Sequence, residues 1–159
     1  MRAKLNDILI TRVFKAPVKL VWKAWSDPQH LMRWWGPKDF TAPSCKTDFR
    51  VGGKYHWCMR GPDGRDYWST GEFREIIPMK RIVYTDCFAD EKGNVVHASH
   101  YGLPGEDWPL EMKVTVTFEE LSGTTKMTLN HVGHPAGKMG EMATAGWNQS
   151  LDKLAESLK

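Results

Sequence analysis

Two side chains of this chain stand where an acid or a base could act on a bound molecule. Asp86 interrupts the apolar run 82–88, and a carboxylate in such surroundings is a candidate catalytic acid or base. His131 follows Met127 and Leu129 at alternating positions, so on a strand these three side chains share one face. Both residues are therefore candidates for acid–base chemistry. A histidine that only completes the core or its rim is the alternative for His131.

The direction in which Asp86 points depends on the facing of its strand. Side chains two residues apart lie on the same face of a strand, so if Tyr84 points into the interior, Asp86 does as well. The other face carries Val83, Thr85 and Cys87 and is equally apolar. The sequence leaves both orientations open.

Four histidines form two pairs with a spacing seen in metal sites, His97-x-x-His100 and His131-x-x-His134. A metal needs imidazole nitrogens that converge to within about 2.0–2.2 Å of one point. The first pair falls in a long segment without periodicity, the second falls at the end of a strand, and no carboxylate spacing supports either pair. We expect no metal and no cofactor.

Motifs for other chemistries are missing. The chain contains no G-x-S-x-G, no Walker A sequence and no G-x-G-x-x-G. The three cysteines, Cys45, Cys58 and Cys87, are widely spaced and form no C-x-x-C pair. This usage is typical of a reduced compartment, where such cysteines pack as small hydrophobic side chains.

The chain is instead rich in residues that suit the wall of an apolar cavity. It has eight Trp and eight Met, and the Met side chain adapts to ligands of different shape. Gly146 leaves space beside the large ring of Trp147. The alternative is that the aromatic side chains interlock without a void, with Trp34 and Trp35 capping the core. The expected wall consists of Trp34, Trp35, Tyr55, Trp57, Met59, Phe73, Tyr84, Asp86, Met127, Leu129, His131, Met142, Trp147 and Leu151.

The elements that must position these residues follow from alternating apolar residues and from breaks at Pro and Gly. Alternation predicts strands over 8–15, 44–50, 54–60, 67–77, 81–88, 111–121 and 124–132. Helical spacing predicts two short helices, 18–26 and 28 to about 35, separated at Asp27-Pro28. The stretch 89–109 has no clear periodicity, and loops of that length are usually functional or mobile.

The segment 138–158 predicts a long helix with one broad apolar stripe. We expect Met142, Trp147, Leu151 and Leu154 to be buried against the sheet. A single helix of about 30 Å with small residues on its stripe cannot fill the concave face of so long a sheet. The predicted fold class is α+β: a curved antiparallel sheet of six or seven strands wrapped around a long C-terminal helix, with two short helices after the first strand. A cavity is the expected remainder.

Length and composition limit the function classes. The 159 residues fit one domain, 1–159. The net charge of +3 comes without a long basic cluster, which argues against nucleic-acid binding. No stretch approaches the roughly 20 apolar residues of a membrane span, and the first residues lack the apolar run of a signal peptide. We expect a cytoplasmic protein.

Several local patterns, spread over nearly the whole chain, resemble one family. They are Ala16-Pro17 with Trp22 and Trp25, Trp34-Trp35-Gly36-Pro37, Asp48–Gly53, Gly71-Glu72-Phe73, Arg81–Thr85, Val114–Phe118 and Gly146-Trp147 with Leu151 and Leu154. In these patterns the chain is similar to the START-like, or SRPBCC, superfamily of helix-grip proteins, and within it to homologues of the activator of the heat-shock-protein-90 ATPase (Aha-type). The resemblance implies the helix-grip fold and a superfamily that includes lipid carriers, ligand sensors, cyclases and resistance proteins.

Three functions follow, in order of preference. The first is a protein that holds a small apolar or amphipathic molecule between the sheet and the last helix. The second is an enzyme that uses the same cavity, with Asp86 or His131 as acid or base. The third is an interaction module of the co-chaperone type that contacts a chaperone. The co-chaperone has an additional N-terminal domain, whereas this chain begins at the grip domain, so we expect no activation of the chaperone by this chain alone. The sequence leaves the oligomeric state unknown.

Overall fold

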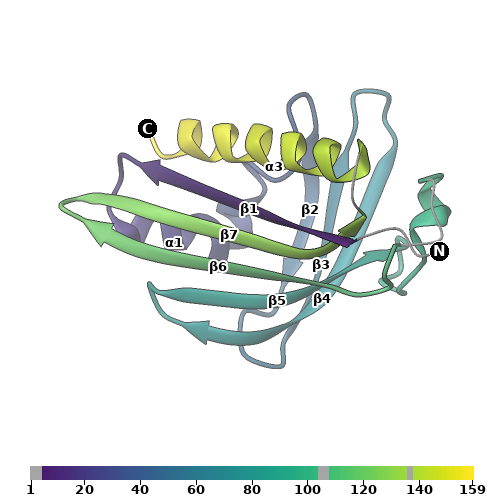
Figure 1. The fold of residues 1–159 in the computed structure, drawn as a ribbon, viewed down its shortest axis with the longest axis horizontal. Coiled ribbons are helices and arrows are strands. Elements are labelled where there is room, and N and C mark those ends of the chain that lie inside the picture. The colour runs from purple at the N-terminus through teal and green to yellow at the C-terminus, as the bar shows by residue number, and fades with distance from the viewer. Residues whose placement is uncertain (1–4, 104–107, 136–137) are drawn as a thin grey trace.

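The computed structural model describes residues 5–103, 108–135 and 138–159. These residues form the predicted α+β fold, in which a seven-stranded antiparallel sheet bends around one long helix (Figure 1). The helices are α1 (Val18–Ser26), α2 (Pro28–Leu31), the short 3-10 helix η1 (Ala98–Tyr101) and α3 (Lys138–Ser157). The strands are β1 (Leu5–Phe14), β2 (Thr41–Thr47), β3 (Lys54–Arg60), β4 (Asp66–Ile77), β5 (Arg81–Ala89), β6 (Met112–Leu121) and β7 (Thr124–Pro135).

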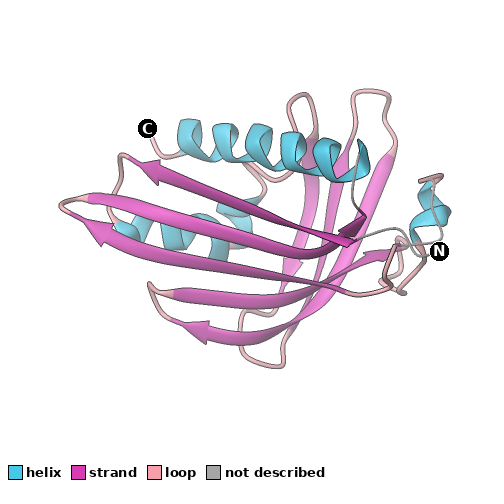
Figure 2. Cartoon of the chain, viewed as in Figure 1, coloured by secondary structure: helices cyan, strands magenta, loops and turns pink. Residues whose placement is uncertain are grey.

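The sheet has the order β1-β7-β6-β5-β4-β3-β2, and every neighbouring pair is antiparallel. Strands β1, β7 and β6 lie along one common axis with alternating direction, and β2 and β3 stand steeply to that axis (Figure 1). This strong twist is what a long antiparallel sheet develops. In Figure 2 the helix α3 runs alongside β1 and passes across the steep strands.

A proline-punctuated sequence forms the helix pair after β1. The Asp27 carboxylate accepts a hydrogen bond from the backbone N–H of Gln29 at 2.9 Å, and Pro28 occupies the first turn of α2. Both features favour a helix start. α2 ends at Leu31, so the expected extension to about Trp35 is wrong. The chain turns there instead, and this turn allows the Trp34 indole N–H to donate to the carbonyl of Ala24 at 2.9 Å.

The strand β2 also differs from its predicted range, 44–50, because the segment Asp48–Gly53 forms a turn. The N–H of Gly53 donates to the carbonyl of Arg50 at 2.8 Å. The N–H of Asp48 donates to the carbonyl of Lys54 at 3.0 Å. A Cβ at Gly53 would lie 2.0 Å from the Asp48 carbonyl oxygen. Only glycine fits this tight return, which joins β2 to β3.

Gly71 brings strands β4 and β5 unusually close to a side chain of β3. A Cβ at this position would lie 1.9 Å from the carbonyl oxygen of Thr85 and 2.8 Å from the ring of Tyr55. Because Gly71 has no side chain, Tyr55 reaches past β4, and its hydroxyl donates to the Thr85 carbonyl at 2.7 Å. This contact fixes the aromatic interior of the sheet.

The C-terminal half of α3 closes the core. Leu151 and Leu154 are fully buried, as predicted, and they belong to one apolar cluster with Leu31, Trp34 and Leu129. The N-terminal half is different. Met142 is 57% exposed, so the prediction that it is buried against the sheet is wrong, and Trp147 is only partly buried.

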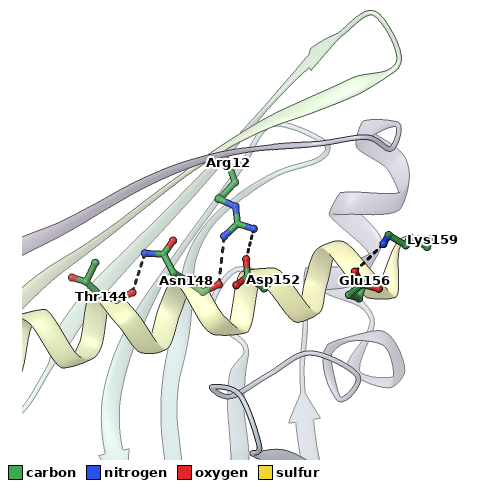
Figure 3. A network of polar contacts seen from close by, with 6 residues as sticks. All are labelled: Arg12, Thr144, Asn148, Asp152, Glu156 and Lys159. Carbon is green, nitrogen blue, oxygen red and sulfur yellow. Dashed lines mark hydrogen bonds and ion pairs between the residues drawn. The ribbon is translucent and has the colours of Figure 1, made fainter.

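Polar contacts hold α3 in place on both sides. The Arg12 guanidinium on β1 lies 2.7 Å from the Asp152 carboxylate and 3.4 Å from the Asn148 carbonyl (Figure 3). On the opposite side, the Lys153 ammonium donates to three carbonyls of the segment 36–40, at 2.9–3.3 Å. The Ser150 hydroxyl accepts from the Gly36 N–H at 3.0 Å. These contacts fix the helix against β1 and against the loop that follows α2.

The described residues of the stretch 89–109, which are 89–103 and 108–109, include segments that pack against the sheet. The Tyr101 hydroxyl of η1 donates to the Ala89 carbonyl and accepts from the N–H of Trp68 at 3.0 Å. Trp108, Ala98 and Met112 form a second, smaller buried cluster. These described residues therefore close one end of the sheet.

No helix of the described part of the chain is long and apolar enough to cross a membrane.

Candidate functional site

A cavity of about 390 Å³ lies between the sheet and the N-terminal half of α3. Its wall is mainly aromatic and aliphatic, and Asp86 and His131 are the acid and the histidine in it. Such a size and such a mixture are typical of sites for small organic molecules. The described lining residues are Trp35, Gly36, Pro37, Phe40, Met59, Tyr67, Trp68, Ser69, Asp86, Cys87, Phe88, Leu103, Met112, His131, Met142, Ala143, Gly146, Trp147 and Ser150.

The structure separates the residues expected in the wall into two groups. Six of them border this cavity: Trp35, Met59, Asp86, His131, Met142 and Trp147. The others lie deeper in the apolar core: Trp34, Tyr55, Trp57, Phe73, Tyr84, Met127, Leu129 and Leu151. The bordering group spans four elements and the turn after α2, whereas the deeper group packs beneath it.

The aromatic rings connect these two groups. Trp35 lies 5.5 Å from Trp147 and 4.7 Å from Trp57, measured between ring centroids. Trp57 in turn stacks on Tyr55 at 3.9 Å. A molecule in the cavity would thus contact Trp35 and Trp147 directly, and the rings behind them form a packed support.

The facing of β5, which the sequence left open, is defined by two contacts. The Tyr84 ring lies 5.4 Å from Tyr55 inside the core, and Asp86 borders the cavity. The interior face of β5 is therefore the one that carries Tyr84, Asp86 and, at its end, Phe88. Asp86 sits where the packed core gives way to the cavity.

Polar atoms of four residues form a continuous line that leads from the cavity wall into the core. The Trp147 indole N–H donates to His131 Nδ1 at 3.0 Å. His131 Nε2 lies 3.1 Å from Asp86 Oδ2, and the other carboxylate oxygen lies 3.2 Å from the Tyr55 hydroxyl. The line joins α3, β7, β5 and β3. His131 is 4% exposed and the Asp86 side chain 21% exposed, so within this acid–histidine pair the carboxylate is the more accessible group.

Burial keeps the neighbouring hydroxyl and thiol groups protonated. Burial, followed by the charge of Asp86, holds the pKa of both Tyr55 and Tyr84 well above the usual tyrosine range. Burial, again with Asp86 as the next cause, raises the pKa of the Cys87 thiol to about 11. A protonated thiol is a poor nucleophile, so Cys87 behaves as the small apolar residue that its spacing predicted.

Several lining residues were not anticipated from the sequence. Tyr67 and Ser69 share the face of Phe73 on β4, and Phe88 shares the face of Asp86 on β5, so alternation alone could have identified them. Phe40 and Leu103 come from segments without periodicity, and nothing in the sequence pattern marks them.

The histidine pairs do not assemble a metal centre in the described residues, which contain no group of three His, Cys, Asp or Glu side chains able to hold a metal. His97 is the N-cap of η1, His100 lies within that helix, and His131 is buried inside the fold. The side chain of His134 lies outside the described residues.

The fold defines the chain as a helix-grip protein, and comparison with known proteins gives its family. The model of the Activator of Hsp90 ATPase homolog 1-like protein family matches residues 15–159. Because the match covers most of the chain, the protein belongs to this family, and the resemblance seen in the sequence is confirmed. None of the curated proteins matches the chain.

Solved structures agree with this placement. Protein CV1439 from Chromobacterium violaceum is 32% identical, with a TM-score of 0.79 and 96% of each chain covered. A protein from Arthrobacter aurescens is 29% identical, with a TM-score of 0.77, and the match covers 99% of this chain and 92% of that one. The AHSA1 protein from Silicibacter pomeroyi, at 24% identity and a TM-score of 0.77 over 96% and 97% of the two chains, supports the fold alone.

Proposed function

We propose that the protein binds a small apolar or amphipathic molecule in the cavity under the N-terminal half of α3. The observation that carries the proposal is the cavity itself, about 390 Å³ in volume and walled by aromatic and Met side chains. The space opens to solvent beside Met142, which is 57% exposed. A concave, mainly apolar space of this size with a few polar groups is the kind of site in which proteins bind small organic molecules.

Binding is favoured over catalysis by the contacts of His131. Its Nδ1 accepts from the Trp147 indole and its Nε2 faces the Asp86 carboxylate, so both ring nitrogens are engaged within the wall. A general base needs a nitrogen within hydrogen-bond reach of the substrate. These contacts give His131 the role of positioning Trp147 and Asp86.

The second candidate function is an enzyme that uses Asp86 as its acid or base. It is supported by the position of the Asp86 carboxylate, which is the acidic group among the described lining residues of the cavity. An enzyme that used Asp86 as its base would lose turnover in Asp86→Asn while still binding its substrate. A binding protein has no turnover to lose. Comparing product formation with binding in this variant separates the two functions.

The cavity proposal is tested by titrating fatty acids, flavonoids and polyketide-like aromatic compounds into the protein while recording Trp emission and the melting temperature. A bound compound should change the emission of Trp35 and Trp147 and raise the melting temperature by mass action. Gly146→Leu should remove both responses, because Gly146 borders the cavity and an added Cβ meets only the Pro37 ring, at 3.4 Å.

The matched control is Ala145→Leu, which adds the same kind of side chain to the adjacent position of α3, on the exposed side of the helix. It should leave the responses unchanged. If no compound changes emission or stability in the wild-type protein, the cavity is not a binding site, and the co-chaperone type of interaction becomes the better account. A stimulation of the Hsp90 ATPase by this chain alone would support that account.

A further inference from the structure

The charge of the cavity wall is set by very few groups. Among the described lining residues there is no Lys and no Arg, and Asp86 is the only carboxylate. The charge that a bound molecule experiences therefore depends on Asp86 and on the protonation state of His131, the two titratable groups that meet at 3.1 Å.

The contact with Trp147 defines the protonation of His131. An indole N–H can only donate, so the Nδ1 atom that receives it at 3.0 Å must carry a lone pair. The ring proton is then on Nε2, which faces Asp86 Oδ2. His131 is therefore neutral in this arrangement, and the wall carries the single negative charge of Asp86.

The carboxylate of Asp86 has acceptor capacity left for a ligand. An ionised carboxylate offers about four acceptor positions. His131 Nε2 faces one oxygen, and the Tyr55 hydroxyl, which donates mainly to the Thr85 carbonyl at 2.7 Å, lies 3.2 Å from the other. With its side chain 21% exposed at the cavity wall, Asp86 presents its remaining lone pairs to the cavity.

We propose that the cavity selects ligands with an aromatic body and a neutral or cationic hydrogen-bond donor that meets Asp86, and that it rejects carboxylates such as fatty acids. This inference rests on the proposed binding function and specifies its ligand class. The aromatic body matches the rings of Trp35, Phe88 and Trp147. The donor matches a carboxylate in an apolar wall, where an anion would meet an uncompensated like charge.

The test uses four compounds that share a naphthalene ring and differ at one group: 2-naphthylmethanol, its methyl ether, 2-naphthylmethylamine and 2-naphthoate. Isothermal titration calorimetry at pH 7 gives each dissociation constant. Because a hydrogen bond to a charged group is worth roughly tenfold or more in affinity, the alcohol and the amine should bind at least about tenfold more tightly than the ether. The naphthoate should bind most weakly.

Two variants assign this preference to the charge of Asp86. Asp86→Asn keeps the shape and removes the charge, so the preference for amine over naphthoate should fall by about tenfold or more. Met142→Lys adds a cation at an exposed position of the wall, where Met142 is 57% exposed, and should shift affinity toward naphthoate. Met142→Gln is its neutral control. This second variant decides the question if Asp86→Asn fails to fold.

The outcomes separate the two proposals. If none of the four compounds binds the wild-type protein, the binding function fails and the ligand class fails with it. If all four bind within about threefold of each other, or the naphthoate binds most tightly, the cavity binds ligands but the inference on Asp86 is overturned. An unchanged preference in a folded Asp86→Asn protein, or in Met142→Lys, would overturn it as well.

Discussion

The two halves of α3 perform different tasks on the same sheet. The C-terminal half places Leu151 and Leu154 in the core with no exposed surface. The N-terminal half places Ala143, Gly146 and Trp147 over a cavity of about 390 Å³. The C-terminal half resembles an ordinary amphipathic helix. The N-terminal half leaves unfilled the volume that larger side chains would occupy.

The difference shows how one helix can combine stability with an internal space. Buried leucines supply hydrophobic stabilisation of about 25 cal/mol for each Å² of apolar surface removed from water. Ser150 and Lys153 then fix the loop of residues 36–40 by hydrogen bonds. The contacts of the C-terminal half thus also hold the N-terminal half in place, so that the N-terminal half needs no dense packing of its own. Four experiments can test this division and the core that lies beneath it.

The largest change in stability is expected in the C-terminal half of α3. Leu151→Ala should lower the free energy of unfolding by about 2–5 kcal/mol, because it opens a void in a fully packed site. Met142→Ala, in the other half and 57% exposed, should change it by less than about 0.5 kcal/mol. Urea denaturation measures both. Similar losses in the two variants would contradict the division of the helix.

Alkaline pH should affect the core beneath the cavity. The pKa of Tyr55 and of Tyr84 is held above its usual range in the folded state by burial and then by Asp86. The unfolded chain therefore releases these protons first as the pH rises. The two tyrosines should leave stability unchanged below about pH 10 and then lower it by about 1.4 kcal/mol per pH unit each. The Cys87 thiol, whose pKa burial raises to about 11, should start a smaller decrease from about pH 9. Melting temperatures between pH 8 and pH 12 measure this, and a flat profile in wild type would argue against buried neutral hydroxyls.

The same two tyrosines differ in their hydrogen bonds. Tyr55→Phe should cost about 1–3 kcal/mol, because the hydroxyl donates to the Thr85 carbonyl in a buried site. Tyr84→Phe should be neutral or slightly stabilising, since no described residue offers its buried hydroxyl a hydrogen-bond partner. The two unfolding free energies, measured side by side, check the ranking. Equal costs would show that the Tyr84 hydroxyl is also satisfied.

The smallest effect has the opposite sign. Gly146→Ala should raise stability by up to about 1 kcal/mol, the difference in helix propensity, because its Cβ meets only the Pro37 ring, at 3.4 Å. Ala145→Gly on the exposed side should lower stability by about the same amount. Thermal unfolding of the pair gives both values. A loss of stability in Gly146→Ala would show that the helix and the 36–40 loop are too close for any side chain.

Much of this fold could be predicted from the sequence, and particular residues show where prediction stopped. The leucine stripe of α3 identified the buried C-terminal half, because 3.6-residue periodicity places these apolar side chains on one face of the helix. The same stripe also included Met142, which is exposed because the helix overhangs the cavity at that point. Periodicity shows which face of a helix is apolar, and it cannot show whether the sheet is near enough to fill it.

The cavity residues could likewise be predicted only in part. Alternation placed His131 and Met59 on the interior face of their strands, where both now border the cavity. It could not choose between the two apolar faces of β5, and the choice is made by the contact of Tyr84 with Tyr55 and by Gly71. Phe40 and Leu103 reach the cavity from irregular segments, whose course is set by tertiary contacts such as those of Lys153.

The most direct test of the central claim, that α3 covers a ligand-binding cavity, is native mass spectrometry of protein purified without denaturation. We expect a co-purifying small molecule that is retained under gentle ionisation and absent from Gly146→Leu, while Ala145→Leu retains it. Wild-type protein that shows only the mass of the bare chain, and that also acquires no adduct from the naphthalene amine or alcohol, would contradict the account.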